Sequence, residues 1–198
     1  MLKGDKKPLE LLYRKYYELL LNYGLKVKCD EDLVKDAIQD LFVKLCNGKY
    51  LLATQYVRAY LLKSLRNILY DKLSAVKPMQ NVDELPFELW VDEDFLSVVF
   101  EDCNEDRVRA KKIMEVYRLL PNNQRMAIYL RYIKGLSYKE MAEVLGINPQ
   151  SSMNLVSRAL TKLRSKLSND DFLFIFSFIF FQYKCCLLYT SPSPRDIS

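Results

Sequence analysis

The most informative absence in this 198-residue sequence is histidine, of which there is none. Histidine is the commonest general base and the commonest metal ligand in proteins, so its absence weakens every hypothesis of an enzyme or a metal site. The five cysteines form no C-x-x-C pair, which argues against a zinc or redox motif. A lone cysteine nucleophile would also lack a base to activate it. We therefore expect no catalytic residue, no cofactor and no metal.

Chain-breaking residues are scarce as well, with five glycines and seven prolines. This scarcity favours helices, and the 50% of apolar residues are enough to build a core. We expect an all-α protein. No apolar run approaches the 20 or so residues that a membrane span needs, so we expect no integral membrane insertion. Scattered cysteines without a signal peptide are typical of a cytoplasmic protein.

Basic residues are missing from one segment of the chain. Residues 81–106 contain ten Asp and Glu and no Lys or Arg, whereas residues 1–80 and 107–170 are both net basic. This pattern predicts two small domains that bind polyanions, joined by an acidic linker over 81–106. The alternative is that the basic residues are ordinary solvated faces and the acidic strip is a disordered loop. If the strip is a linker, limited proteolysis should cut there first.

Apolar residues recur at three- and four-residue spacings, which predicts amphipathic helices in both domains. The first helix should begin near Leu9 and end at Gly24, because glycine suits a helix C-terminus. Asp30 is expected to cap the second helix. Further helices are expected over about 54–73, 108–120 and 124–134, with the last two stopped by Pro121 and Gly135.

The clearest motif lies between residues 137 and 167. Ser137 and Glu140 have the spacing of a capping box at the start of a short helix, and Gly146 permits the positive φ of a tight turn. Asn148 and Pro149 then suit the cap and first position of a second helix. A short helix, a glycine turn and a second helix with a polar face are typical of a helix-turn-helix, whose second helix enters the major groove. A plain helical hairpin is the alternative.

The two faces of the second helix are expected to have different roles. The residues expected to be buried are Ile147, Met153, Val156, Leu160, Leu163 and Leu167. The residues expected to contact DNA are Lys139, Ser151, Asn154, Ser157, Arg158 and Lys162. Asparagine and arginine read adenine and guanine edges, and lysine holds phosphates.

Several short sequence motifs, spread between about residue 8 and residue 168, resemble those of a known protein family. They are Asp36-Ala37-Ile38-Gln39-Asp40-Leu41-Phe42, YLLKSLRN from Tyr60, Leu120-Pro121, GLSYKEMA from Gly135 and SRAL from Ser157. In this order and spacing they resemble the extracytoplasmic-function sigma factors of bacterial RNA polymerase. The resemblance implies a transcription initiation factor that directs core RNA polymerase to promoter DNA and helps to open it. It also implies a membrane-tethered anti-sigma factor as a partner.

The resemblance assigns roles to residues of both domains. The second domain would read the minus-thirty-five element. In the first domain, core polymerase would bind Asp36, Gln39, Asp40 and Phe42; composition alone would make Phe42 a core residue and the others a solvated face. The residues implied to bind the minus-ten element are Lys63, Arg66, Asn67, Tyr70 and Lys72. Aromatic rings stack on unpaired bases and cations hold the strand. Ser152 departs from the family, which usually has an apolar residue there.

Two other classes of function stay open. A helix-turn-helix regulator that binds an operator independently of polymerase would not need the patch at residues 36–42, so binding to core polymerase separates the two. An enzyme is the least favoured. Residues 171–198 are expected to be dispensable. Residues 172–181 form an aggregation-prone apolar run, for which the alternative is a native segment that packs on the second domain. Residues 186–196 resemble the in-frame translation of a transposase adapter used in sequencing libraries.

Overall fold

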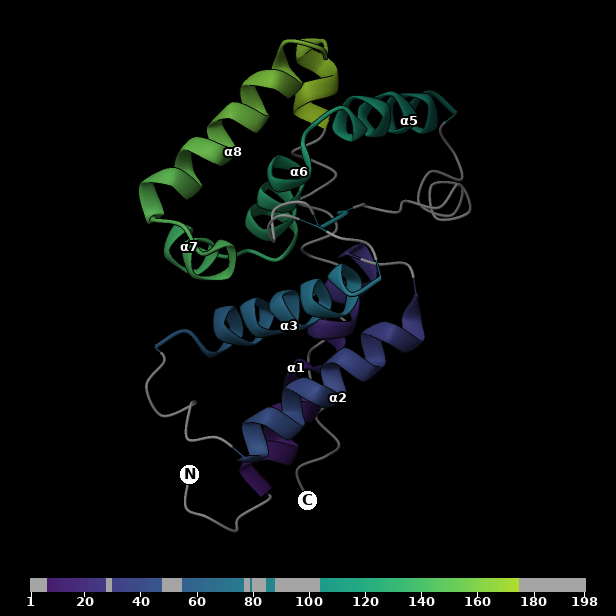
Figure 1. Cartoon of the computed structure of the whole chain (residues 1–198). Helices are drawn as coiled ribbons and strands as arrows, with labels where there is room; N and C mark the ends of the chain where they lie inside the picture. The colour runs from purple at the N-terminus through teal and green to yellow at the C-terminus, as the bar shows by residue number, and fades with distance from the viewer. Residues whose placement is uncertain are drawn as a thin grey trace, which may run out of the picture. The chain divides into compact units, whose positions relative to one another are not determined.

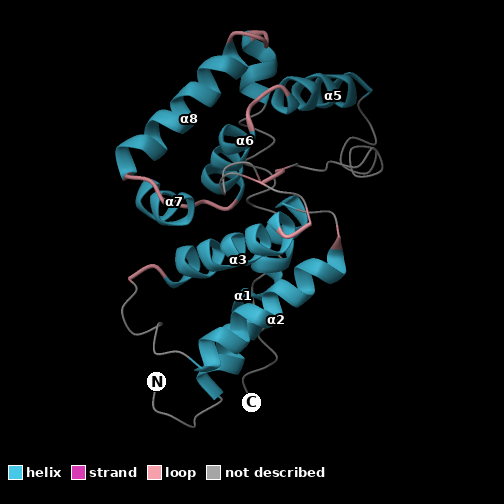
Figure 2. Cartoon of the chain, in the orientation of Figure 1, coloured by secondary structure: helices cyan, strands magenta, loops and turns pink. Residues whose placement is uncertain are grey.

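The computed structural model describes residues 7–27, 30–47, 55–76, 79, 85–87 and 104–174 (Figure 1). All regular elements in these ranges are helices, which confirms the predicted all-α class (Figure 2). The chain divides by its contacts into two compact units. The first unit consists of Met1–Trp90 and Ser137–Asn154, and the second of Val91–Leu136 and Leu155–Ser198.

The first unit contains α1 (Lys7–Val27), α2 (Glu31–Asn47), α3 (Val57–Ser74) and α7 (Tyr138–Leu145). Their apolar faces form its core, as the helical periodicity predicts. The side chains that are almost fully buried there include Leu20, Tyr23, Ile38, Leu41, Leu61, Leu62, Leu65 and Leu69. Asp30 caps α2, as predicted, with its carboxylate accepting a hydrogen bond from the backbone N–H of Leu33 at 3.3 Å.

Gly24 does not end the first helix, so that prediction is wrong. α1 continues to Val27, and Gly24 is buried within it. A Cβ atom at this position would lie 2.3 Å from Cγ1 of Val34 on α2. The glycine therefore permits the close approach of two helices. A local sequence pattern cannot distinguish this packing role from helix termination.

Part of the predicted acidic linker is packed against the first unit. Leu85 and Phe87 are 1% and 0% exposed, and the ring of Phe87 lies 6.5 Å from that of Tyr23. These apolar side chains fix the chain where the linker was expected to begin. Residues 88–103 lie outside the described residues, and the next helix, α5 (Asn104–Arg118), begins at Asn104.

The second unit contains α5, α6 (Asn122–Ile128), the π-helical turn η3 (Tyr129–Ile133) and the larger part of α8 (Pro149–Arg164). Pro121 separates α5 from α6, as predicted. Gly135 has a φ of 64°, which L residues with a side chain rarely adopt, and it follows the end of η3. The hydroxyl of Tyr117 donates to the backbone carbonyl of Arg125 at 2.9 Å and ties α5 to α6.

The chain beyond α8 contains one more packed segment. Residues 169–174 are helical, and the Ser168 hydroxyl accepts a hydrogen bond from the backbone N–H of Asp171 at 3.1 Å. The Asp171 carboxylate is 7% exposed and pairs with the Lys112 ammonium at 2.6 Å. Asp171 therefore belongs to the folded unit, and the dispensability of residues 171–198 for function stays a prediction. The rest of the apolar run and the adapter-like end lie outside the described residues. No described helix is both long and apolar enough to cross a membrane.

Candidate nucleic-acid interface

The short helix α7 begins with the predicted capping box. The Ser137 hydroxyl accepts from the backbone N–H of Glu140 at 3.2 Å, and the Glu140 carboxylate accepts from the backbone N–H of Ser137 at 2.9 Å. Burial of the Glu140 carboxylate raises its pKa, but hydrogen bonds from Ser137 and Arg58 outweigh burial, so that the pKa is lowered overall. The carboxylate is therefore held in its charged form.

The turn after α7 also follows the prediction. Gly146 adopts a φ of 68°, and the backbone N–H of Ile147 returns to the carbonyl of Ala142 at 3.0 Å. The side chain of Asn148 accepts from the backbone N–H of Ser151 at 2.7 Å, and α8 starts at Pro149. These local bonds build the helix, turn and second helix of a helix-turn-helix.

The buried face of α8 differs from the predicted one at its start. Ser152 is fully buried, and its hydroxyl lies 2.9 Å from the carbonyl oxygen of Tyr138 and 2.8 Å from that of Pro149. A polar side chain can be buried here because its one hydroxyl proton can be donated to either of these backbone carbonyls. Met153 and Ile147 were expected in the core and are instead 44% and 37% exposed. The buried stripe consists of Ser152, Val156, Ala159 and Leu163.

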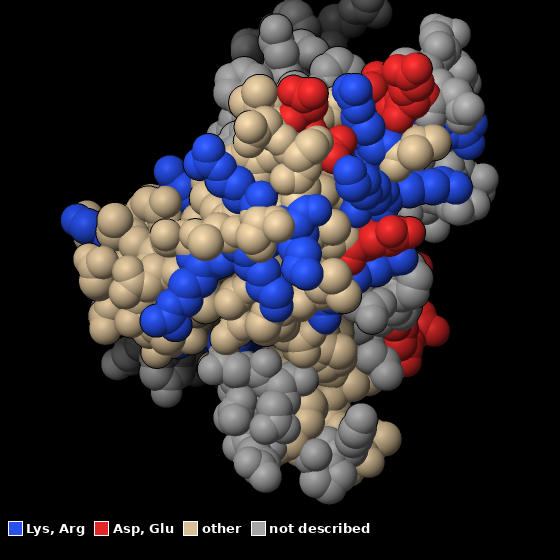
Figure 3. Space-filling view, turned by 90° about the horizontal axis from the view of Figure 1, so that it is seen from above, with Lys and Arg blue, Asp and Glu red and all other residues tan. Residues whose placement is uncertain are grey.

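The opposite face of α8 carries the residues predicted to contact DNA. Its exposed residues include Asn154, Ser157, Arg158 and Lys162, while Ser151 is half-buried and Lys139 is exposed on α7. The amide of Gln150 donates to the Asn154 side chain at 3.3 Å, and the Lys162 ammonium donates to the carbonyl of Leu119 at 3.1 Å. Basic side chains spread over the middle of the face in Figure 3, and acidic ones lie toward its edge.

The residues expected to bind the minus-ten element lie along α3, but several are engaged by other groups. Asn67 is exposed, and the hydroxyl of Tyr70 donates to the carbonyl of Met79 at 3.0 Å. The ammonium of Lys72 pairs with Asp40 on α2 at 2.7 Å. The remaining two residues, Lys63 and Arg66, contact α7, and Arg66 is only 4% exposed.

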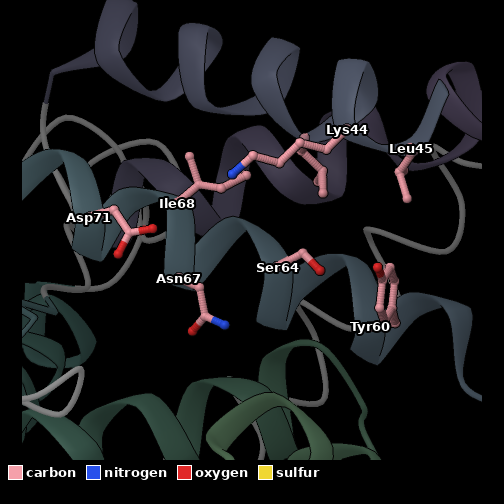
Figure 4. Close-up of a pocket in the computed structure, with 8 residues that line it drawn as sticks. Lys44, Leu45, Tyr60, Ser64, Asn67, Ile68 and Asp71 are labelled. Carbon is pink, nitrogen blue, oxygen red and sulfur yellow. The ribbon is translucent and has the colours of Figure 1, made fainter. Parts of the chain in front are cut away.

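A pocket of about 200 Å³ lies between α2 and α3 (Figure 4). It is lined by Leu41, Lys44, Leu45, Tyr60, Ser64, Asn67, Ile68 and Asp71. The lining combines an apolar floor with an amide, a hydroxyl and opposite charges. Of these residues, only Asn67 was predicted from the sequence to belong to a site. The sequence feature that could have revealed them is the spacing of the polar side chains at 60, 64, 67 and 71, which places them on one face of α3.

The patch predicted to bind polymerase is divided between surface and core. Asp36 and Gln39 are exposed on α2, and Asp40 is half-buried. Phe42 is 7% exposed, and its ring meets that of Tyr13 edge-on at 4.9 Å. Phe42 therefore lies in the core, as composition alone favours, and the polar residues supply the surface.

Comparisons with known proteins agree with this site. The family described as Sigma-70, region 4, matches residues 110–163, from α5 to the last turn of α8. The chain is 23% identical over 158 residues to the ECF RNA polymerase sigma factor SigM of Bacillus subtilis, and the match covers 78% of this chain and 91% of SigM. It is 26% identical over 165 residues to the RNA polymerase sigma factor SigZ of the same organism, covering 80% and 86%.

The chain is therefore similar along most of its length to RNA polymerase sigma factors, and residues 110–163 match their region 4. Its fold is similar to that of the sigma factor RpoE from Bartonella quintana, solved in complex with the anti-sigma factor NepR, with a TM-score of 0.57 and 19% identity. The likeness covers 83% of this chain and 99% of RpoE. These similarities favour a sigma factor over an operator-binding regulator that works without polymerase.

Proposed function

We propose that the sigma factor reads the minus-thirty-five element as duplex with the exposed face of α8. The capped α7, the Gly146 turn and the exposed Asn154 and Arg158 on α8 carry this assignment. Bidentate contacts from these two residue types distinguish bases in the major groove. Lys139, Ser151, Ser157 and Lys162 surround them and suit phosphate or base contacts.

The minus-ten element is proposed to bind along α3 as an opened strand. The pocket between α2 and α3 suits one unpaired base, because Tyr60 supplies a ring and Asn67 an amide that can hydrogen-bond to a base edge. Lys44 at the rim supplies a cation for the adjoining phosphate. Lys63, Arg66, Tyr70 and Lys72 extend the surface along the same helix.

Core RNA polymerase is proposed to bind the exposed part of α2. Asp36 and Gln39 are exposed to solvent, and the neighbouring Asp40 is half-buried. Phe42 supports this surface from behind through its contact with Tyr13. On this assignment, residues 1–80 form the domain that binds polymerase and the minus-ten element. Residues 107–170 form the domain that binds the minus-thirty-five element, and residues 81–106 connect the two domains.

The chain's activity, cellular location and protein partner follow from the same assignment. Sigma factors act by binding, so we propose that this chain has no enzymatic activity of its own. We propose that it acts in the cytoplasm, where bacterial promoter DNA and RNA polymerase are found. The similar RpoE chain was solved in complex with an anti-sigma factor, and we propose a partner of this class here.

The polymerase assignment is tested by co-purification of core RNA polymerase with the full chain. We expect Asp36→Asn combined with Gln39→Ala to reduce polymerase recovery at least severalfold. The unfolding midpoint should stay nearly unchanged, because changes at exposed sites usually cost little stability.

Glu18→Gln, which removes one exposed carboxylate from α1, is the control and should recover as much polymerase as the unmodified chain. Equal recovery by all three proteins would contradict the assignment of α2.

A further inference from the structure

Met153 is an apolar side chain on the polar side of α8. It is the fifth residue of that helix and is 44% exposed. Gln150 and Ser157, three residues before it and four after it, are its neighbours on the helix surface, and both are exposed. The first turns of a recognition helix are the part that reaches base edges in the major groove. Met153 therefore lies where the proposed function places duplex DNA.

The burial of Ser152 explains why Met153 faces outward. Ser152 is fully buried, and its hydroxyl oxygen lies 2.9 Å from the carbonyl oxygen of Tyr138 in the first turn of α7. Successive side chains of an α-helix point about 100° apart. Because Ser152 is held against α7, Met153 is turned away from the buried stripe. Its exposure is thus set by the packing of the two helices of the helix-turn-helix.

The side chain of methionine suits one group in the major groove. Thymine is the only base that presents an apolar group there, its C5 methyl, whereas cytosine presents an N4 amino group. Methionine is unbranched and flexible, and its sulfur is only a weak hydrogen-bond acceptor. It gains free energy by burying a methyl group and loses free energy by burying an amine that has no partner. Contact with Met153 therefore favours thymine over cytosine.

The side chains around Met153 distinguish it from other exposed apolar residues. Isolated apolar side chains are common on protein surfaces and need no function. Met153, however, lies between two amides that are able to read bases, since Gln150 donates to the Asn154 side chain at 3.3 Å. A surface that reads bases must lose its water, and an apolar side chain loses water at a gain in free energy. Met153 can therefore contribute to affinity on this surface as well as to base preference.

We propose that Met153 is a specificity-determining residue, which contacts the C5 methyl group of a thymine in the minus-thirty-five element. The inference rests on the proposed reading of this element by α8. It deepens that proposal because it names the base and the chemical group that one side chain recognises. It also gives a function to a side chain that the sequence pattern placed in the core.

The test uses the complex of the full chain with core RNA polymerase. Selection from a library of random duplexes supplies a sequence that this complex binds. Each thymine of that sequence is then replaced in turn by deoxyuridine, which lacks only the methyl group. At one thymine of the minus-thirty-five element, we expect the replacement to weaken binding about three- to fivefold, the effect of losing one buried methyl group. The complex with Met153→Ala should bind these two duplexes equally.

Two further variants serve as controls. Met153→Leu keeps an apolar side chain and should retain the sensitivity to deoxyuridine. Val108→Ala removes an apolar side chain that is 61% exposed on α5, and it should retain the sensitivity as well.

Undiminished sensitivity of Met153→Ala at every thymine would overturn the inference, and so would a selected sequence in which no thymine methyl group affects binding. A failure of the proposed function would appear separately. If the Arg158→Ala chain selected the same sequence as the unmodified chain as well, the proposed reading of duplex DNA by α8 would itself be wrong.

Discussion

At the residue scale, Arg158 is the side chain on which the proposed reading of duplex DNA depends most. It is exposed on α8 one turn after Asn154. We expect Arg158→Ala to cost roughly 1–3 kcal/mol of binding on a cognate duplex and to relax the base preference there. Competition binding with cognate and scrambled duplexes measures both effects. An equal loss on the two duplexes would show that Arg158 holds only a phosphate.

Gly24 gives a second prediction at this scale, because its two physical effects have opposite signs. In a helix interior, alanine is favoured over glycine by roughly 0.5–1 kcal/mol. A Cβ atom at this position would nevertheless meet Val34 at 2.3 Å. We expect the clash to win and Gly24→Ala to destabilise the chain by about 1–3 kcal/mol in denaturant unfolding.

Val34→Ala serves as the partner in a double-mutant cycle. Together the two changes should cost less than the sum of their separate effects, because the smaller side chain makes room. A stabilised Gly24→Ala variant would show that the two helices do not approach so closely.

At the scale of elements, the helical segment over residues 169–174 is expected to stabilise the second unit through Asp171. A hydrogen bond from Lys112, followed by one from Ser168, lowers the pKa of this carboxyl. A carboxyl whose pKa is lower in the folded state than the ordinary 3.9 or so contributes stability above about pH 4. That contribution is lost as the pH falls through the folded-state pKa.

Asp171→Asn should therefore lower the stability by about 1–2 kcal/mol at pH 7, and by much less near pH 3. Asp170→Asn, at the exposed neighbouring position, should have little effect at either pH. Urea unfolding at the two pH values measures the difference. A penalty for Asp171→Asn that does not change with pH would rule out the ionised carboxylate as its cause.

The helices and turns also show which structural features can be predicted from the sequence. The capping box, the Gly146 turn and the Asn148 cap were predictable, because each depends on residues within four positions of one another. The environments of Gly24 and Ser152 were not. Gly24 is explained by a side chain on another helix, and Ser152 by a carbonyl 14 residues away in α7. Hydrophobic periodicity assigns such residues to the core or the surface from their residue type alone. It does not identify the residue on another helix that each one contacts.

At the scale of the whole molecule, charge segregation predicted two basic regions and an acidic strip, but not the pairing of α3 with α7. The Arg58–Glu140 pair joins residues 82 positions apart. Local patterns cannot anticipate it, and both residues have ordinary surface chemistry. The Leu85 and Phe87 anchor was missed for a related reason, since two apolar side chains in an acidic strip do not reveal what they pack against.

Transcription from promoter DNA by core RNA polymerase supplied with the full chain tests whether this chain works as a sigma factor. Selection from a library of random duplexes, followed by sequencing of the transcript starts, removes the need to know the promoter. We expect transcripts from templates that share two separated sequence motifs, and none from core polymerase alone. Binding to duplex DNA without any binding to core polymerase, and without transcripts, would identify an operator-binding regulator instead of a sigma factor.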